Sequence, residues 1–249
     1  MKHMIRASFY KLFHDKATWI GLVGTVAWSL LTGSMIAWSA DTKLDLSDAY
    51  ALEKYWRDFM SFHAIRIPLL VSAMALFTAE FKDKSWKLLI ARGISKTSFF
   101  FSKVLCILVL TMMISFVAIV SGAAYGVTAL GMQTDGAFMG NLFQYYLLQT
   151  VAHGTAAILI LAISFLIKTG EISSSLNAIL LIFGTMALSK MESALSLGAA
   201  LTGSWAFAQS MLVSFTGQSE WIRLIIVFAA YFIICSLAVL LFERHRDID

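Results

Sequence analysis

Long apolar stretches alternate with short polar segments along the whole chain. Five of these stretches carry no charged residue, and a sixth is interrupted only by His63 and Arg66. A bilayer core about 30 Å thick needs roughly 20 apolar residues at a helical rise of about 1.5 Å each. The pattern therefore predicts an all-α polytopic membrane protein with six transmembrane helices in a single transmembrane domain, 1–249. The six stretches are 17–40, 59–79, 104–131, 137–167, 172–189 and 224–242.

The composition agrees with this class. Of the 249 residues, 59% are hydrophobic and 14% are charged, and Pro68 is the single proline. The first stretch is longer than a signal-peptide core of about 7 to 15 residues, and Trp38 stands where a small residue should precede cleavage after Ala40. We interpret it as a retained span. Cys106 and Cys235 lie inside apolar runs, which is typical of packed core residues rather than of a disulfide or a metal site.

The basic residues predict the orientation. If both termini are cytoplasmic, thirteen of the 19 lysines and arginines flank the inner ends of the spans. This distribution follows the positive-inside rule. We therefore expect a multi-pass protein of the plasma membrane with both termini in the cytoplasm. The net charge of +4 then reflects topology and attraction to anionic membrane lipid, and we expect no nucleic-acid partner.

Two sizeable segments are predicted on the outer face. Residues 41–58 are mildly acidic. Residues 191–220 contain an uncharged part, 194–215, that is long enough for a seventh span and would then place the C-terminus outside. That part is rich in Gly, Ser and Ala, and a seventh span breaks the charge bias. We therefore predict short re-entrant helices here, packed against protein so that their backbone groups are satisfied.

The first 16 residues precede the first span. Ile5, Phe9, Leu12 and Phe13 recur at helical spacing on one stripe. This pattern predicts a helix that lies in the inner membrane interface, with its rings in the acyl boundary and its cations toward phosphate. A plain basic flank of the first span is the alternative interpretation.

The densest charge cluster, residues 80–103, separates the second and third stretches and reads EFKDKSWKLLIARGISKTSFFFSK. Asp83 can cap a short helix, Trp86, Leu89 and Ile90 share one face of it, and Gly93 can end it in a left-handed conformation. Ser95 can cap the next helix, which continues into the third span. The pattern predicts a short amphipathic helix with an apolar face that is stable only when it docks on another surface.

The order of residues in this segment resembles the type-2 ATP-binding-cassette (ABC) permeases, especially the peptide-export and bacteriocin-immunity permeases of Gram-positive bacteria. In that family a Glu-Phe pair precedes a polar spacer, Gly-Thr, apolar residues, a Gly-Ile-Ser-Arg-like turn and a phenylalanine-rich helix start that ends in Lys. This chain departs from the pattern at Ser85 and Trp86, where Gly-Thr is expected, and at Lys96, which replaces arginine. The matching residues are Glu80, Phe81, Leu88, Leu89, Gly93, Ile94, Ser95, Phe99 and Lys103.

The resemblance implies that 80–103 carries a cytoplasmic coupling helix that sits in a groove of a separate ABC ATPase subunit. Trp86, Leu89 and Ile90 would then fill the groove. Glu80 would pair with a cation such as Lys84 or hold the inner ends of the spans together. The residues implied in ATPase coupling are Glu80, Asp83, Lys84, Trp86, Lys87, Leu89, Ile90, Arg92 and Gly93, with Lys84 and Lys87 at the rim of the groove.

The chain lacks the sequence patterns of an enzyme. It contains no Gly-x-x-x-x-Gly-Lys-Ser/Thr phosphate-binding loop, no His-Glu-x-x-His and no Gly-x-Ser-x-Gly, and its five histidines have no metal-ligand spacing. We therefore predict no catalytic residues, no metal and no cofactor in this chain. The resemblance to ABC permeases implies that ATP and Mg²⁺ bind to the partner subunit and that a second copy of this or a related permease completes the transport path.

Four polar residues inside the predicted spans are candidates for the substrate path: His63, Arg66, His153 and Asn177. An ionisable side chain in the apolar layer needs water or a partner. Arg66 either snorkels to the outer interface or faces an outward vestibule, and His63 lies one turn before it. His153 and Asn177 are also typical of hydrogen bonds between helices, and Gly122 with Gly126 permits close helix packing.

The sequence therefore predicts the membrane subunit of an ATP-driven exporter that moves an amphiphilic or hydrophobic substrate. An antimicrobial peptide is the preferred substrate class, because the predicted spans contain few charges. Two alternatives stay open: a drug or antibiotic exporter, and a membrane immunity protein that binds a toxic peptide without ATP. A channel or scaffold would not explain an amphipathic docking helix.

Overall fold

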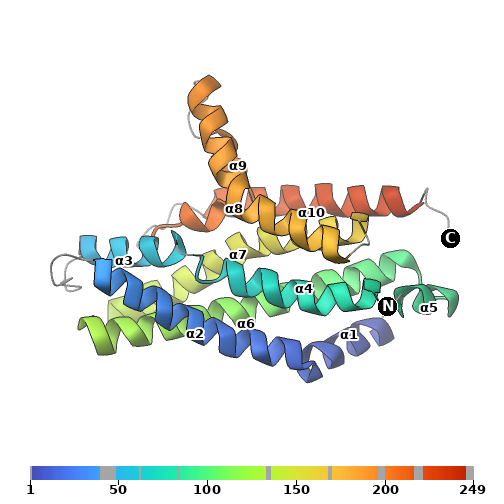
Figure 1. The fold of residues 1–249 in the computed structure, drawn as a ribbon, viewed down its shortest axis with the longest axis horizontal. Coiled ribbons are helices and arrows are strands. Elements are labelled where there is room, and N and C mark those ends of the chain that lie inside the picture. Colours follow the sequence, from blue (N-terminus) through green and yellow to red (C-terminus); the bar gives the residue numbers. More distant parts are fainter. Residues whose placement is uncertain are drawn as a thin grey trace.

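A computed structural model describes residues 2–39, 49–61, 63–82, 85–132, 136–167, 170–195, 200–215 and 221–244. Within these ranges all regular elements are helices, as the sequence predicts (Figure 1). They are α1 (Lys2–His14), α2 (Lys16–Ser39), α3 (Ala49–Ser61), α4 (Arg66–Lys82), α5 (Ser85–Ala91), α6 (Lys96–Leu130), α7 (Gly136–Ile167), α8 (Gly170–Leu195), α9 (Ala200–Ser204), the 3₁₀ turn η1 (Gln209–Met211) and α10 (Trp221–Arg244).

Six candidate membrane spans occur in the described part of the chain, which confirms the predicted number. They correspond to α2, the α3–α4 pair, α6, α7, α8 and α10. Residues 200–215 form two short helical pieces, α9 and η1, instead of a seventh span. The Gly, Ser and Ala content of this segment thus correctly predicted short helices.

The second span is broken, which the sequence pattern did not predict. A continuous helix was expected over 59–79, but α3 ends at Ser61 and α4 begins at Arg66. Between them His63 adopts a left-handed backbone conformation with φ 59°. Pro68 is the third residue of α4. Its missing N–H costs no helical hydrogen bond there, because the N–H groups of the first turn have no acceptor within the helix. The single proline was therefore the available signal for a helix start.

Helix α3 also replaces part of the acidic segment expected at 41–58. Its Tyr55 and Trp56 are fully buried, and the Tyr55 hydroxyl donates to the carbonyl oxygen of Gly122 at 2.8 Å. A Cβ atom at Gly122 would lie 2.7 Å from the Phe59 ring. The glycine therefore allows α3 to approach α6 within this chain, in agreement with a packing role.

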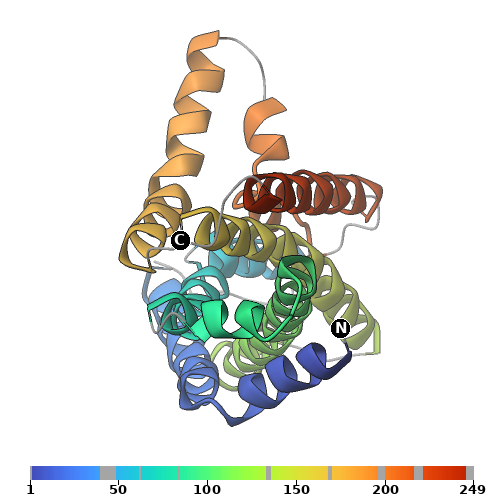
Figure 2. The same ribbon diagram turned by 90° about the vertical axis from the view of Figure 1, so that its right-hand side faces the viewer.

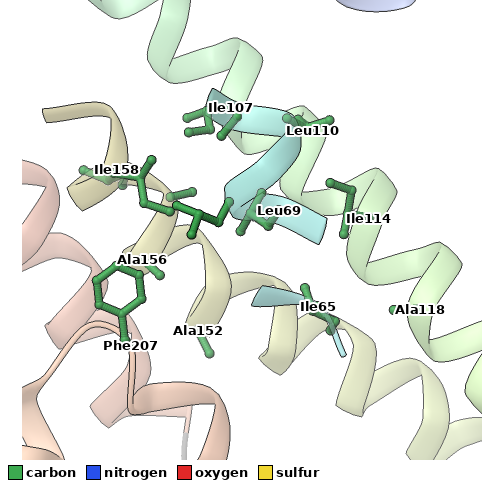
Figure 3. Close-up of a cluster of buried hydrophobic side chains, with 14 of the residues drawn as sticks. Ile65, Leu69, Ile107, Leu110, Ile114, Ala118, Ala152, Ala156, Ile158 and Phe207 are labelled. Carbon is green, nitrogen blue, oxygen red and sulfur yellow. The ribbon is translucent and has the colours of Figure 1, made fainter. Parts of the chain in front are cut away.

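The centre of the bundle is apolar and is built by α4, α6 and α7. Figure 3 shows Leu69 of α4 lying between Leu110 of α6 and the α7 residues, with Ile65, just before α4, lower down on the side of Ala118. Phe207, from the segment that follows α9, reaches the same cluster beside Ala156 (Figure 3). The segment 200–215 is thereby part of the core rather than a surface loop.

The bundle has two ends, which we name by the short helices that lie there. Figure 1 shows α1, α5 and the last turn of α10 at one end, the α5 end. Helix α3 and the junction between α6 and α7 lie at the opposite end, the α3 end. Helix α1 packs along α6, where Leu12 is buried and the hydroxyls of Ser8 and Ser102 are 3.4 Å apart.

Helix α8 leaves the bundle partway along its length. Its first part runs with the other spans, and its last part extends away from them with α9 beside it (Figures 1 and 2). Met186, Met191 and Leu195 are exposed on this arm, whereas Glu192 is buried. The Glu192 carboxylate accepts from the backbone N–H and the hydroxyl of Thr202, each at 2.6 Å, which fixes α9 to the arm.

Candidate functional site

The first candidate site is the short helix α5 and the corner that follows it. Gly93 has φ 86°, and the backbone N–H of Ile94 donates to the carbonyl of Leu89 at 3.2 Å, so the helix ends in a left-handed turn as predicted. Ser95 then caps α6, because its hydroxyl accepts from the N–H of Ser98 at 3.2 Å. The α5 corner is therefore an ordered, capped structure.

Helix α5 directs its apolar face toward its own chain. Trp86 is only 8% exposed and belongs to the buried core, while Leu89 and Ile90 are partly buried against that core. Helix α5 packs on α4. In the chain alone, Trp86 thus holds α5 in place, whereas the sequence analysis expected it to project into a partner.

A different set of side chains remains accessible on α5. Leu88 is 62% exposed, and Arg92 and Gly93 are also exposed. Lys87 is half-buried, with its ammonium 5.8 Å from the centroid of the Trp86 ring. Asp83 and Lys84 lie outside the described residues, and so does the side chain of Glu80 in α4. Their predicted roles stay predictions.

The second candidate site lies where the second span is broken. Arg66 begins α4 and is only 2% exposed. Sixteen residues at 1.5 Å place it about 24 Å from the α5 end of α4, which lies within an apolar layer about 30 Å thick but toward its far side. Arg66 therefore neither snorkels to an interface nor faces an open vestibule here. Both orientations expected from the sequence are replaced by a buried one.

Three elements bring polar groups to the Arg66 guanidinium. Its Nε donates to the Ser210 hydroxyl at 3.0 Å, and its Nη2 donates to the same oxygen. Its Nη1 donates to Nδ1 of His63 at 3.1 Å. Because arginine only donates, Nδ1 of His63 must be the acceptor, so the ring proton of neutral His63 sits on Nε2.

Helix α7 supplies the other side of this cluster. The Gln149 side-chain amide donates to the carbonyl of Ser210 at 3.0 Å, and Nδ1 of His153 donates to the carbonyl of Gln149 at 2.8 Å. His153 is buried one helical turn after Gln149 on α7. We name His63, Arg66, Gln149, His153 and Ser210 the polar cluster. Sequence reasoning found its two histidines and its arginine but missed Gln149 and Ser210.

The polar cluster contains a buried cation without an anion. Among the described residues, no carboxylate lies within ion-pairing distance of Arg66, and its hydrogen-bond partners there are the neutral groups of Ser210 and His63. The Gln149 side-chain oxygen is also buried and has no partner in the described structure. A lone charge in the apolar layer is costly, so this arrangement is typical of a functional position.

The segment 200–215 contacts the polar cluster through Ser210 and is held at several further points. The N–H of Phe215 donates to the Glu53 carboxylate on α3 at 2.9 Å. The Phe215 ring stacks on Trp56 with centroids 5.5 Å apart and planes 4° from parallel. The N–H of Ala206 donates to the Tyr231 hydroxyl on α10 at 3.2 Å. These contacts join the segment to α3 and α10 as well as to α4 and α7.

The remaining candidate, Asn177, lies outside the polar cluster. It is fully buried on α8, and its side-chain amide donates to the carbonyl of Ile160 at 3.4 Å. This bond connects α8 to α7, which fits a role between helices. No group of histidine, cysteine or acidic side chains with the arrangement of a metal site occurs among the described residues.

The sequence matches a known protein family. A sequence profile of the ABC-2 family transporter proteins matches residues 4–187, more than half of the chain. The chain belongs to this family. As an ABC-2 permease subunit with six candidate spans it is a multi-pass membrane protein, and membership implies an ATPase partner. No curated protein matches the chain.

Proposed function

We propose that this ABC-2 permease subunit forms part of an ATP-driven exporter, with its α5 end and both termini in the cytoplasm. The distribution of lysine and arginine supports this orientation, because thirteen of 19 lie near the ends of the spans assigned to that side. ATP and Mg²⁺ are bound by the ATPase subunit, and this chain contributes the membrane path.

The capped corner at α5 is the observation that carries the proposal. A short helix that is fixed on α4 by Trp86 and stopped at Gly93 transmits a displacement to α4 and α6 together, since it lies between them in the chain. Leu88 and Arg92 form the accessible surface for the partner, with Lys87 at its edge. The apolar residue that contacts the ATPase is therefore Leu88, whereas the sequence-based prediction assigned this contact to Trp86.

A second copy of this or a related permease completes the path. The arm of α8 and the outer faces of α8 and α10 expose apolar side chains, including Met186, Met191 and Ile226. A second subunit packs against part of these faces, and lipid acyl chains contact the rest. This bundle suits an amphiphilic substrate such as an antimicrobial peptide, because the interior contacts of α4, α6 and α7 are largely apolar.

Co-purification tests the proposal. The full chain, solubilised with a candidate ATPase encoded beside it, should yield a complex whose ATP hydrolysis rises when an amphiphilic peptide is added. Failure of every neighbouring ATPase to associate, together with peptide binding in the absence of ATP, would instead support an immunity protein that only sequesters its target. Stimulation by drugs and not by peptides would favour the antibiotic-exporter alternative.

A further inference from the structure

We propose that Arg66 is the binding site for an anionic oxygen group, a carboxylate or a phosphate, carried by an amphiphilic ligand. The inference rests on the proposed export function for its physiological meaning, but the binding itself requires neither ATP nor a partner. In this structure the Ser210 hydroxyl lies at the guanidinium edge that we assign to the anionic oxygen. The following contacts support the assignment.

The geometry at Arg66 matches anion recognition. Carboxylates and phosphates bind arginine through two parallel N–H donors on one edge of the guanidinium. In this chain Nε and Nη2, which form one such edge, both point to the single hydroxyl oxygen of Ser210. A neutral oxygen thus stands where an anionic oxygen would bind more strongly. The guanidinium supplies the two N–H donors, and the described residues supply no carboxylate to accept from them.

The surroundings explain why an anion would be preferred over a cation or a neutral group. His63 accepts from Arg66 through Nδ1, so its opposite ring nitrogen is a donor. His153 donates its own Nδ1 proton to the Gln149 carbonyl. The helix α4 begins at Arg66, and its positive end lies at the same place. The positive end of α4 and the Nε2–H of His63 add positive potential and a donor, whereas Nε2 of neutral His153 is an acceptor, and the described part of the cluster contains no acid.

We place the entry of the ligand at the break in the second span. Non-helical backbone inside a membrane is tolerated where it lines a cavity or packs against protein. Here residues 63–65 lie between α3 and α4 and are not helical. Ser210 packs beside them, and it belongs to a segment that lies between the fifth and sixth spans. Movement of 200–215 away from α4 removes the hydroxyl from Arg66 and uncovers the guanidinium. The headgroup of the ligand then enters the break, and its apolar part stays in the membrane.

Matched probes test this inference on the purified full chain in nanodiscs of a zwitterionic lipid. We would measure binding of myristyl phosphate, myristic acid, myristyl alcohol and myristylamine by native mass spectrometry. These probes share one apolar chain and differ in the headgroup. The phosphate and carboxylate should bind about tenfold or more tightly than the alcohol and the amine. The ratio between the phosphate and the carboxylate then tells a lipid-like headgroup from the carboxylate of a peptide.

Variants separate a binding role from a structural one. Arg66→Gln should abolish the preference for anionic probes, and Arg66→Lys should keep part of it, because lysine retains the charge without the fork. Arg57→Gln is the control, since Arg57 is exposed on α3 beside Glu53. Ser210→Ala should strengthen the binding of anionic probes by about tenfold and leave the alcohol unchanged, because the competing hydroxyl is gone.

Three results would overturn the inference: equal binding of all four probes, retention of the anion preference in Arg66→Gln, or equal weakening of all probes in Ser210→Ala. Each of these can occur while the ATPase still associates and transport continues, in which case only the anion site fails. Normal anion binding by a chain that associates with no ATPase would instead contradict the proposed export function alone.

Discussion

Arg66 at the start of α4 and Ser210 in the segment after α9 are joined by two hydrogen bonds across 144 residues of sequence. This contact closes the break in the second span and holds the covering segment on the bundle. It also leaves a cation in the apolar layer with neutral partners among the described residues. The relationship links the stability of the α3 end to the site that we propose for an anionic headgroup.

Arg66→Gln should not destabilise the protein substantially. The hydrogen bonds to Ser210 and His63 offset only part of the cost of burying the charge, and a glutamine can replace one of them. We expect the free energy of unfolding to change by less than about 1 kcal/mol. Thermal unfolding of purified variants, with Arg57→Gln as the control, measures this. A large drop in Tm would mean that Arg66 serves mainly to hold the fold.

A cysteine at Ser210 should react slowly with an impermeant thiol reagent, because Ser210 is only 3% exposed. Ser204→Cys is the matched comparison in the same segment, since Ser204 is exposed, and it should react quickly when the reagent is added from outside the cell. Glu53→Ala removes the acceptor of the Phe215 N–H and should speed the labelling of Ser210→Cys. Labelling of both sites only from the cytoplasmic side would reverse the proposed orientation.

Gly122→Ala should destabilise the contact between α3 and α6. The new methyl group would lie 2.7 Å from the Phe59 ring, and Tyr55 bonds to the carbonyl of the same glycine. Overpacking of this kind costs about 1–3 kcal/mol. Gly140→Ala, where no atom lies within 4 Å of the added carbon, is the control and should be neutral or slightly stabilising. Equal Tm values for the two variants would show that α3 is not held against α6.

Trp86→Ala should release α5 from α4 without removing the surface that it presents. Trp86 is buried within the chain, so its loss acts through packing and should cost about 2 kcal/mol or more. We expect ATP hydrolysis in the complex to lose its response to substrate while the ATPase still co-purifies. Loss of co-purification itself would return Trp86 to the role that the sequence analysis assigned to it.

Much of the fold follows from local patterns, because long apolar runs and capping residues act within a few turns. The six spans, the stop at Gly93 and the cap at Ser95 are of this kind. The break between α3 and α4 was missed because 59–79 has no ionisable residue except His63 and Arg66, although Pro68 marked a helix start.

The two candidate sites were predictable to different degrees. At α5 the spacing correctly showed which side chains share a face. It could not show that Trp86 packs on the chain itself, because an apolar stripe has the same sequence pattern whether its own chain or a partner covers it. At the polar cluster, His63 and Arg66 were predicted to lie one turn apart on one helical face. Their side chains do meet, but across the break before α4, because His63 lies in a left-handed turn rather than in the helix. Ser210 and Gln149 depend on long-range packing, which no local pattern encodes.

The most direct test of the account measures ATPase association and substrate-stimulated ATP hydrolysis for Leu88→Asp in the co-purified complex. Leu88 is the large apolar side chain that α5 exposes, and a charge there should disrupt a docked surface while leaving the fold intact. Tyr50→Asp, an exposed position at the α3 end, is the control. We predict loss of the ATPase and of stimulated hydrolysis in Leu88→Asp alone, with unchanged Tm and membrane insertion. Full association and stimulation in Leu88→Asp would contradict coupling through α5.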